Sequence, residues 1–87
     1  MSTGARLSYV TVPHCHFCED GRAIVRRLSA DSGIPAEHLD WHSDAGARLL
    51  AIEPAPFPPA LYLGDRLLGY GRLSERRLRK LLRRIPA

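Results

Sequence analysis

Two cysteines, Cys15 and Cys18, constrain the fold of this chain most strongly because of where they stand. The segment just before them, Leu7 to Val12, alternates and is rich in β-branched and aromatic residues, which predicts a strand. From the second cysteine onward, small and apolar residues recur at helical spacing until Gly33 and Pro35 end the pattern. The residues on this helical face are Cys18, Gly21, Val25 and Leu28. A strand, a cysteine pair and a helix in this order predict the start of a β-α-β unit.

The middle of the chain predicts a second strand and a second helix. Residues 37–42 alternate between polar and apolar, which indicates a strand with Trp41 on its core face. Ser43 or Asp44 can then cap a short helix that ends before Pro54. Because the first strand, the first helix and this strand follow one another, we expect two parallel strands joined by a right-handed crossover.

The last third of the chain predicts a hairpin and a final helix. The proline-rich residues 54–59 exclude regular structure. Strands are predicted at 60–63 and 66–70, joined by the two-residue turn 64–65. Ser74 then caps a helix with one apolar face. That face holds Leu78, Leu81, Leu82 and Ile85. The predicted order is therefore β-α-β-α-β-β-α.

Length and composition bound what such a fold can be. With 87 residues, 45% of them hydrophobic, the chain predicts a single domain spanning residues 1–87. No apolar run approaches a signal peptide or a membrane span, so we expect a cytoplasmic protein that binds no membrane. In a reducing compartment, a cysteine pair indicates catalysis or metal binding rather than a structural disulfide.

Thiol–disulfide exchange accounts for the spacing of the two cysteines. This chemistry requires a thiolate nucleophile and a second thiol that resolves the mixed disulfide. Cys15, at the head of the helix, faces free backbone N–H groups and the positive end of the helix dipole, which favour its thiolate. Cys18 lies one turn later, on the inward face. We therefore predict that Cys15 attacks and that Cys18 resolves.

Three neighbouring side chains are predicted to modulate Cys15. His14 and His16 flank it directly, and an imidazolium at either position would lower the pKa of the Cys15 thiol. The alternative is that each histidine is a solvated loop residue with no effect on the sulfur. Phe17, between the cysteines, is expected to be exposed and to offer the partner an apolar contact.

Zinc binding is the other chemistry that these residues allow. Residues 14–18 hold four candidate ligands within five positions, but ligands this close at a strand-to-helix junction cannot all converge on one tetrahedral ion. A structural site would need a second ligand pair, and His38 and His42 could supply it only if they lay beside the loop. We predict no metal site, and a small zinc-binding protein remains an alternative.

Three stretches carry a family resemblance: residues 10–18 (VTVPHCHFC), 59–65 (PALYLGD) and 71–82 (GRLSERRLRKLL). Through them the chain resembles the glutaredoxin and thioredoxin superfamily, in particular small glutaredoxin-like proteins of bacterial type, over residues 7–82. The resemblance implies a thioredoxin-like α/β fold, with a four-stranded mixed sheet in the order 2-1-3-4 and three flanking helices. It also implies a thiol–disulfide oxidoreductase that acts on protein or small-molecule disulfides and has no tightly bound cofactor.

The resemblance gives Pro59 a role. The family has a cis-proline at the start of the third strand, opposite the dithiol, where its backbone pairs with the chain of the partner. Pro59 stands at that position, directly before the predicted strand. The preceding residue is Pro58, where the family commonly has threonine, valine or isoleucine, so we expect altered substrate pairing at that edge. Alternatively, Pro58 is the relevant proline, or both bonds are trans.

Two departures from the family leave the electron donor open. Glutaredoxins usually bind glutathione through a glycine pair and a polar or acidic pair, whereas residues 69–74 (GYGRLS) look more like the thioredoxin pattern. Arg72 or the helix N-terminus at Ser74 could hold a carboxylate instead. Thioredoxins carry a tryptophan before the first cysteine and a buried acid on the preceding strand, and this chain has neither. We expect a monomer reduced by a low-molecular-weight thiol or a flavoprotein.

The C-terminal helix is strongly basic in a chain of net charge +4. Between Arg72 and Arg84 there are seven Lys or Arg residues and one acid, Glu75. A solvated helix that covers a sheet has this pattern, because its leucines share one face and its arginines the other. The alternative is a module that binds nucleic acid or an acidic protein. Aromatic residues are not interleaved with the basic ones, so we predict that nucleic acid is not a partner.

Overall fold

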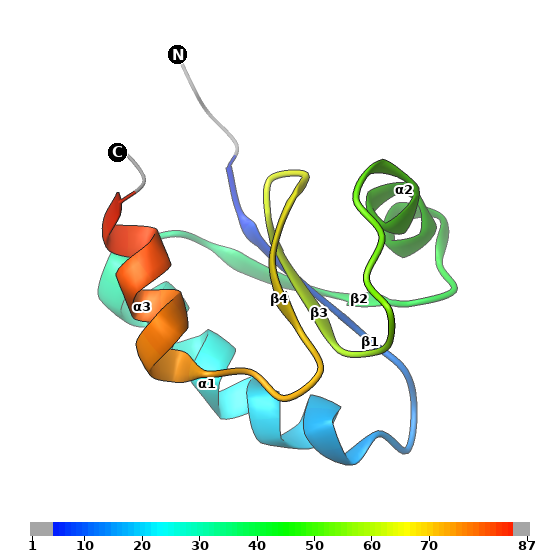
Figure 1. Ribbon diagram of the computed structural model, residues 1–87, viewed down its shortest axis with the longest axis horizontal. Coiled ribbons are helices and arrows are strands. Elements are labelled where there is room, and N and C mark those ends of the chain that lie inside the picture. Colours follow the sequence, from blue (N-terminus) through cyan, green and yellow to red (C-terminus); the bar gives the residue numbers. More distant parts are fainter. Residues whose placement is uncertain (1–4, 85–87) are drawn as a thin grey trace.

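The computed structural model describes residues 5–84, which form a four-stranded sheet with three helices (Figure 1). The elements are β1 (Leu7–Thr11), α1 (His16–Ser32), β2 (Ala36–Asp40), α2 (Asp44–Ile52), β3 (Ala60–Leu63), β4 (Arg66–Tyr70) and α3 (Glu75–Arg84). The strand order is β2-β1-β3-β4, with β1 and β2 parallel and both other pairs antiparallel. This mixed sheet with three helices confirms the predicted thioredoxin-like α/β architecture.

The core has two layers, one on each face of the sheet. The helices α1 and α3 cover one face and α2 covers the other (Figure 1). The first layer is built from Leu7, Tyr9, Val25, Leu28, Leu61 and Leu78. The second is built from Val10, Ala60 and Tyr62. Because β1 lies between two other strands and a core layer covers each of its faces, all of its residues are buried.

The ends of α1 follow from local chemistry. Its buried residues are those on the predicted face, Cys18, Gly21, Val25 and Leu28. The helix ends where Gly33 adopts a left-handed conformation, with φ of 76°, and its N–H donates to the Ser29 carbonyl at 3.0 Å.

Within residues 5–84, no helix has both the length and the apolar character that crossing a membrane requires.

The strand β2 is shorter than predicted. It was expected to reach His42 but ends at Asp40, whose carboxylate accepts the His42 N–H at 2.7 Å. The Ser43 hydroxyl also donates to the Asp40 carbonyl at 2.7 Å and accepts from the Gly46 N–H at 3.0 Å, which caps α2. Trp41 packs against the second layer, as predicted. The strand β1 likewise ends one residue early, at Thr11.

The hairpin and α3 form as predicted. Residues 64–65 join β3 to β4, and the Ser74 hydroxyl accepts the Arg77 N–H at 3.3 Å at the start of α3. Leu78 is buried against the first layer, and Leu81 and Leu82 pack at its edge. Ile85, the last predicted member of this face, lies outside the described residues.

The acid in the basic helix holds α3 on α1. The carboxylate of Glu75 accepts from Arg27 at 2.7 Å and from Arg79 at 2.8 Å. Arg79 also pairs with Asp31 at 2.7 Å. These hydrogen bonds from two guanidinium groups lower the pKa of Glu75 to about 2.

Candidate active site

The two cysteines form a disulfide at the start of α1, with their Cα atoms 5.1 Å apart. Cys15 is the N-cap residue, and its Sγ accepts the backbone N–H of Cys18 at 3.1 Å. The Cys15 carbonyl accepts the N–H of Glu19 at 3.1 Å, which begins the helical hydrogen-bond ladder. Cys15 is half-buried, whereas Cys18 is only 2% exposed. Of the two sulfur-bearing residues, Cys15 is therefore the one that a partner can reach.

The two histidines lie on either side of Cys15, and both are exposed. His14 has φ of 58°, in the left-handed region that histidine enters more readily than most residues. This conformation turns the chain from the end of β1 into α1. His16 is the first residue of α1. Both histidines are therefore exposed at the start of α1, directly before and after Cys15.

Tyr9 holds the first turn of α1 against the sheet. Its side chain is 3% exposed, and its hydroxyl donates to the Cys18 carbonyl at 2.8 Å. Burial raises the pKa of Tyr9 to about 12, so the hydroxyl keeps its proton at neutral pH. Gly21 leaves room for this contact, because a Cβ at that position would overlap the Tyr9 hydroxyl. Sequence reasoning treated Tyr9 only as a strand residue; the glycine on the buried helix face was the available signal.

The predicted cis-proline is present. The Pro58–Pro59 bond is cis, and Pro59 is buried directly before β3. The Pro59 carbonyl accepts the N–H of Gly71 at 2.7 Å. Since the next residue, Ala60, pairs with Val10 in β1, the prolines lie at the end of the sheet from which the chain leaves toward α1 (Figure 1).

Phe17 and Arg72 line the same hollow beside α1. Phe17 is 42% exposed, as predicted, and Arg72 is exposed as well. Together with Leu73 they line a small hollow of about 230 Å³. Its other lining residues are Asp20, Gly21 and Ile24. The structure thus brings Arg72 from the segment before α3 to the first turns of α1.

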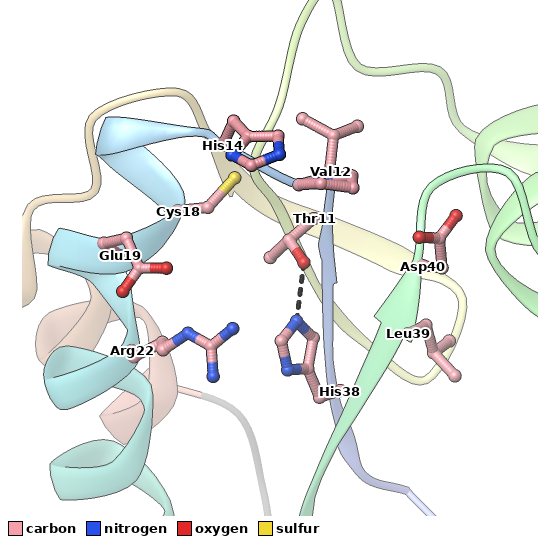
Figure 2. Close-up of a pocket in the computed structure, with 10 residues that line it drawn as sticks. Thr11, Val12, His14, Cys18, Glu19, Arg22, His38, Leu39 and Asp40 are labelled. Atoms are coloured by element: carbon pink, nitrogen blue, oxygen red, sulfur yellow. Dashed lines mark hydrogen bonds between the residues drawn. The ribbon is translucent and has the colours of Figure 1, made fainter.

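A second pocket, of about 330 Å³, is lined in part by Cys18 (Figure 2). Its walls come from the end of β1, the first turns of α1 and the end of β2. They include Cys18, and also Thr11 and His38, whose Oγ1 and Nε2 atoms lie 2.5 Å apart. His38 is exposed as a residue, but its partial burial, followed by the charge of Arg22, lowers its pKa against smaller opposing effects of Asp40 and Glu19.

Sequence reasoning treats His38 only as a possible zinc ligand and does not predict that it lines a pocket with Cys18. The register of the parallel strands sets Tyr9 opposite His38, which puts both side chains on the α1 face. No signal in the sequence specified that register. Among residues 5–84, no group of three or more His, Cys, Asp or Glu side chains is placed to hold a metal ion.

A scan against protein-family models, a search of curated proteins and a search of solved structures each return no match. A proposal for the function of this protein therefore depends on the residues of the site and their geometry.

Proposed function

We propose that this protein is a glutaredoxin-like thiol–disulfide oxidoreductase that uses Cys15 as the nucleophile and Cys18 as the resolving thiol. One observation carries the proposal: Cys15 caps α1 with its sulfur on a backbone N–H, while Cys18 is buried one turn later. In the reduced protein the same N–H and the helix dipole stabilise a thiolate at Cys15. The residue with the better access thus also has the more reactive sulfur.

The reaction proceeds in two exchanges. The Cys15 thiolate attacks one sulfur of the substrate disulfide, forms a mixed disulfide and releases the first substrate thiolate. The Cys18 thiol then loses its proton and attacks the Cys15 sulfur, which releases the second substrate thiolate. Two electrons pass to the substrate, and the product is the Cys15–Cys18 disulfide found in this structure. An external dithiol, or two molecules of a monothiol, returns it to the reduced state.

The surrounding side chains have distinct roles in this proposal. His14 and His16, exposed on either side of Cys15, favour its thiolate when protonated. Because a stabilised thiolate favours the reduced form, the pair is then more oxidising than one without the histidines. Phe17 offers an apolar contact to the substrate. The backbone beside the Pro58–Pro59 bond receives the substrate chain, and Arg72 holds a carboxylate.

The physiological partners follow from the same proposal. The substrates are protein or small-molecule disulfides, and the reductant is a low-molecular-weight thiol or a flavoprotein. No tightly bound cofactor is needed, because both electrons come from the dithiol. We expect the protein to act as a monomer in the cytoplasm.

The proposal is tested by an insulin-type disulfide reduction assay with several electron donors. The Cys15→Ser variant is expected to lose all turnover. The Cys18→Ser variant is expected to form a mixed disulfide that accumulates, because the resolving thiol is gone. Both variants also lose the disulfide, so the reference for their folding is the reduced wild-type protein. An absence of turnover with every donor, together with a Cys15 thiol pKa near the ~8.5 of free cysteine, would count against the proposal.

The basic face of α3 is the observation that favours a second candidate, a module that binds a polyanion. Arg79 is occupied by Glu75 and Asp31, but the other cations of the helix are exposed. These are Arg76, Arg77, Lys80, Arg83 and Arg84. Salt-dependent retention on DNA that survives the Cys15→Ser, Cys18→Ser double change would favour this candidate. The zinc content of the purified protein tests the metal alternative.

A further inference from the structure

The resolving step needs a proton acceptor for Cys18. As a thiol, Cys18 is a poor nucleophile, and its burial disfavours the charged thiolate. The strand before the dithiol brings no carboxylate to it, since β1 has the sequence LSYVT. A side-chain acceptor therefore has to come from outside β1.

The pocket that Cys18 lines contains such a group. His38 enters it from β2, the neighbouring strand, and its Nε2 atom lies 2.5 Å from the Thr11 Oγ1 (Figure 2). Thr11 is 6% exposed and lines the same pocket. The ring of Tyr9 flanks the imidazole, with a centroid separation of 5.7 Å. This hydrogen bond and this ring contact set the orientation of the imidazole.

The charges around His38 keep it able to accept a proton. Facing it from α1 are the cation Arg22 and the carboxylate of Glu19, and from its own strand the carboxylate of Asp40. From β1 it meets the neutral hydroxyl of Thr11 and the ring of Tyr9, and His14, from the loop after β1, lines the same pocket. Burial and Arg22 outweigh the two acids, so the pKa of His38 lies below its usual 6.5 and the ring is neutral at neutral pH.

We propose that His38, acting through the Thr11 hydroxyl, accepts the proton of Cys18 as Cys18 attacks the mixed disulfide. The inference rests on the proposed function. The Cys18 S–H bond breaks and the Cys18–Cys15 S–S bond forms, while the bond between Cys15 and the substrate sulfur breaks. The proton passes to Thr11, which gives its own to His38, and the imidazolium later returns it to solvent or to the departing thiolate. The pocket admits water molecules, which can bridge the thiol to the hydroxyl.

Single-turnover kinetics separate this step from the first attack. The reduced protein is mixed with dithiobis(nitrobenzoate), whose coloured thiolate leaves once on attack by Cys15 and again on resolution by Cys18. In the wild-type protein the second phase is expected to rise through a pKa below 6.5 and to level off at neutral pH. In His38→Asn, that rise is expected to vanish and the neutral rate to fall at least about 10-fold, with the first phase unchanged. Thr11→Val, which removes only the hydroxyl, is expected to show the same loss.

Two further histidine variants serve as controls. His42→Asn changes an exposed histidine that does not line the pocket, and it is expected to leave both phases unchanged. His14→Asn changes the other histidine of the pocket. If His14→Asn removes the rise and His38→Asn does not, the inference is overturned. A wild-type second phase in both His38→Asn and Thr11→Val would overturn it as well. If the first phase never occurs in the wild-type protein, the proposed function itself fails.

Discussion

Each face of the sheet contains one buried tyrosine, and the hydroxyl of each tyrosine donates to a backbone carbonyl of the segment that covers that face. On the α1 face, the Tyr9 hydroxyl donates to the Cys18 carbonyl at 2.8 Å. On the α2 face, the Tyr62 hydroxyl donates to the Glu53 carbonyl at 2.7 Å. Both side chains are almost fully buried, and burial raises the pKa of each hydroxyl. Each tyrosine therefore ties the sheet to the layer that covers it.

The difference lies in what each hydrogen bond holds. The partner of Tyr9 belongs to the first turn of α1, which also presents the Cys15 sulfur. The partner of Tyr62 is the residue that ends α2, where no cysteine or histidine lies. The α1 face also carries the Thr11–His38 pair. We infer that the α1 face combines folding with the chemistry of the dithiol, whereas the α2 face serves the fold.

The largest expected effects come from two helical glycines, one in α1 and one in α2. A Cβ on Gly21 would overlap the Tyr9 hydroxyl, and a Cβ on Gly46 would overlap the Asp40 carbonyl oxygen. We expect Gly21→Ala and Gly46→Ala each to lower the free energy of unfolding by about 1–3 kcal/mol, as overpacking does. Only Gly21→Ala is expected to change the rate at which iodoacetamide alkylates Cys15 in the reduced protein. Urea unfolding and alkylation kinetics measure the two quantities.

The two glycine variants control for each other, because both place an alanine inside a helix and both gain the same helix propensity. Equal changes in the Cys15 alkylation rate would show that the α1 face is no more closely coupled to the dithiol than the α2 face is.

Removing one hydroxyl from each face is expected to have a smaller effect. Tyr9→Phe and Tyr62→Phe each lose one hydrogen bond and leave a carbonyl without that donor, which costs about 1 kcal/mol of unfolding free energy. Tyr9→Phe is also expected to alter the pH dependence of Cys15 alkylation, because the first turn of α1 is then less firmly held. Tyr62→Phe should leave that profile as in the wild type. The idea would be wrong if the alkylation profile of Tyr9→Phe matched the wild type while its stability fell.

The smallest expected effect concerns acid stability and the contact between α1 and α3. Arg27 and Arg79 hold the folded-state pKa of Glu75 at about 2, below its ordinary 4.5. A depressed carboxyl pKa stabilises the fold above the unfolded-state value, and this stabilisation is lost as the pH falls from about 4.5 toward 2. Glu75→Gln is therefore expected to flatten the fall in melting temperature across that window. The effect is small because these ion pairs lie at the surface and are partly exposed to solvent.

Glu53→Gln is the matched control on the α2 face. It keeps an oxygen that can accept the Leu67 N–H, as the Glu53 carboxylate does at 2.9 Å. If Glu53→Gln flattens the fall in melting temperature at acid pH as much as Glu75→Gln does, the ion pairs between α1 and α3 do not cause that fall.

Much of the fold followed from patterns that are local in the chain. The face that α1 buries was predicted residue by residue, because helical spacing alone decides which side chains align. The hairpin turn at 64–65 and the cap at Ser74 were predicted for the same reason. The end of β2 was predicted wrongly, because alternation continues to His42 while the side chain of Asp40 and the hydroxyl of Ser43 turn the backbone.

The sequence by itself determined which side chains lie at the start of α1. Cys15, Cys18 and the two flanking histidines are neighbours in the chain, and their places at a helix start follow from spacing and capping. Only the tertiary structure decided which residues from other elements lie near the dithiol. Tyr9 reaches Cys18 because α1 crosses β1, and His38 reaches the pocket because the parallel register sets it opposite Tyr9. Register and crossing depend on packing between distant segments, which spacing along one strand or helix does not encode.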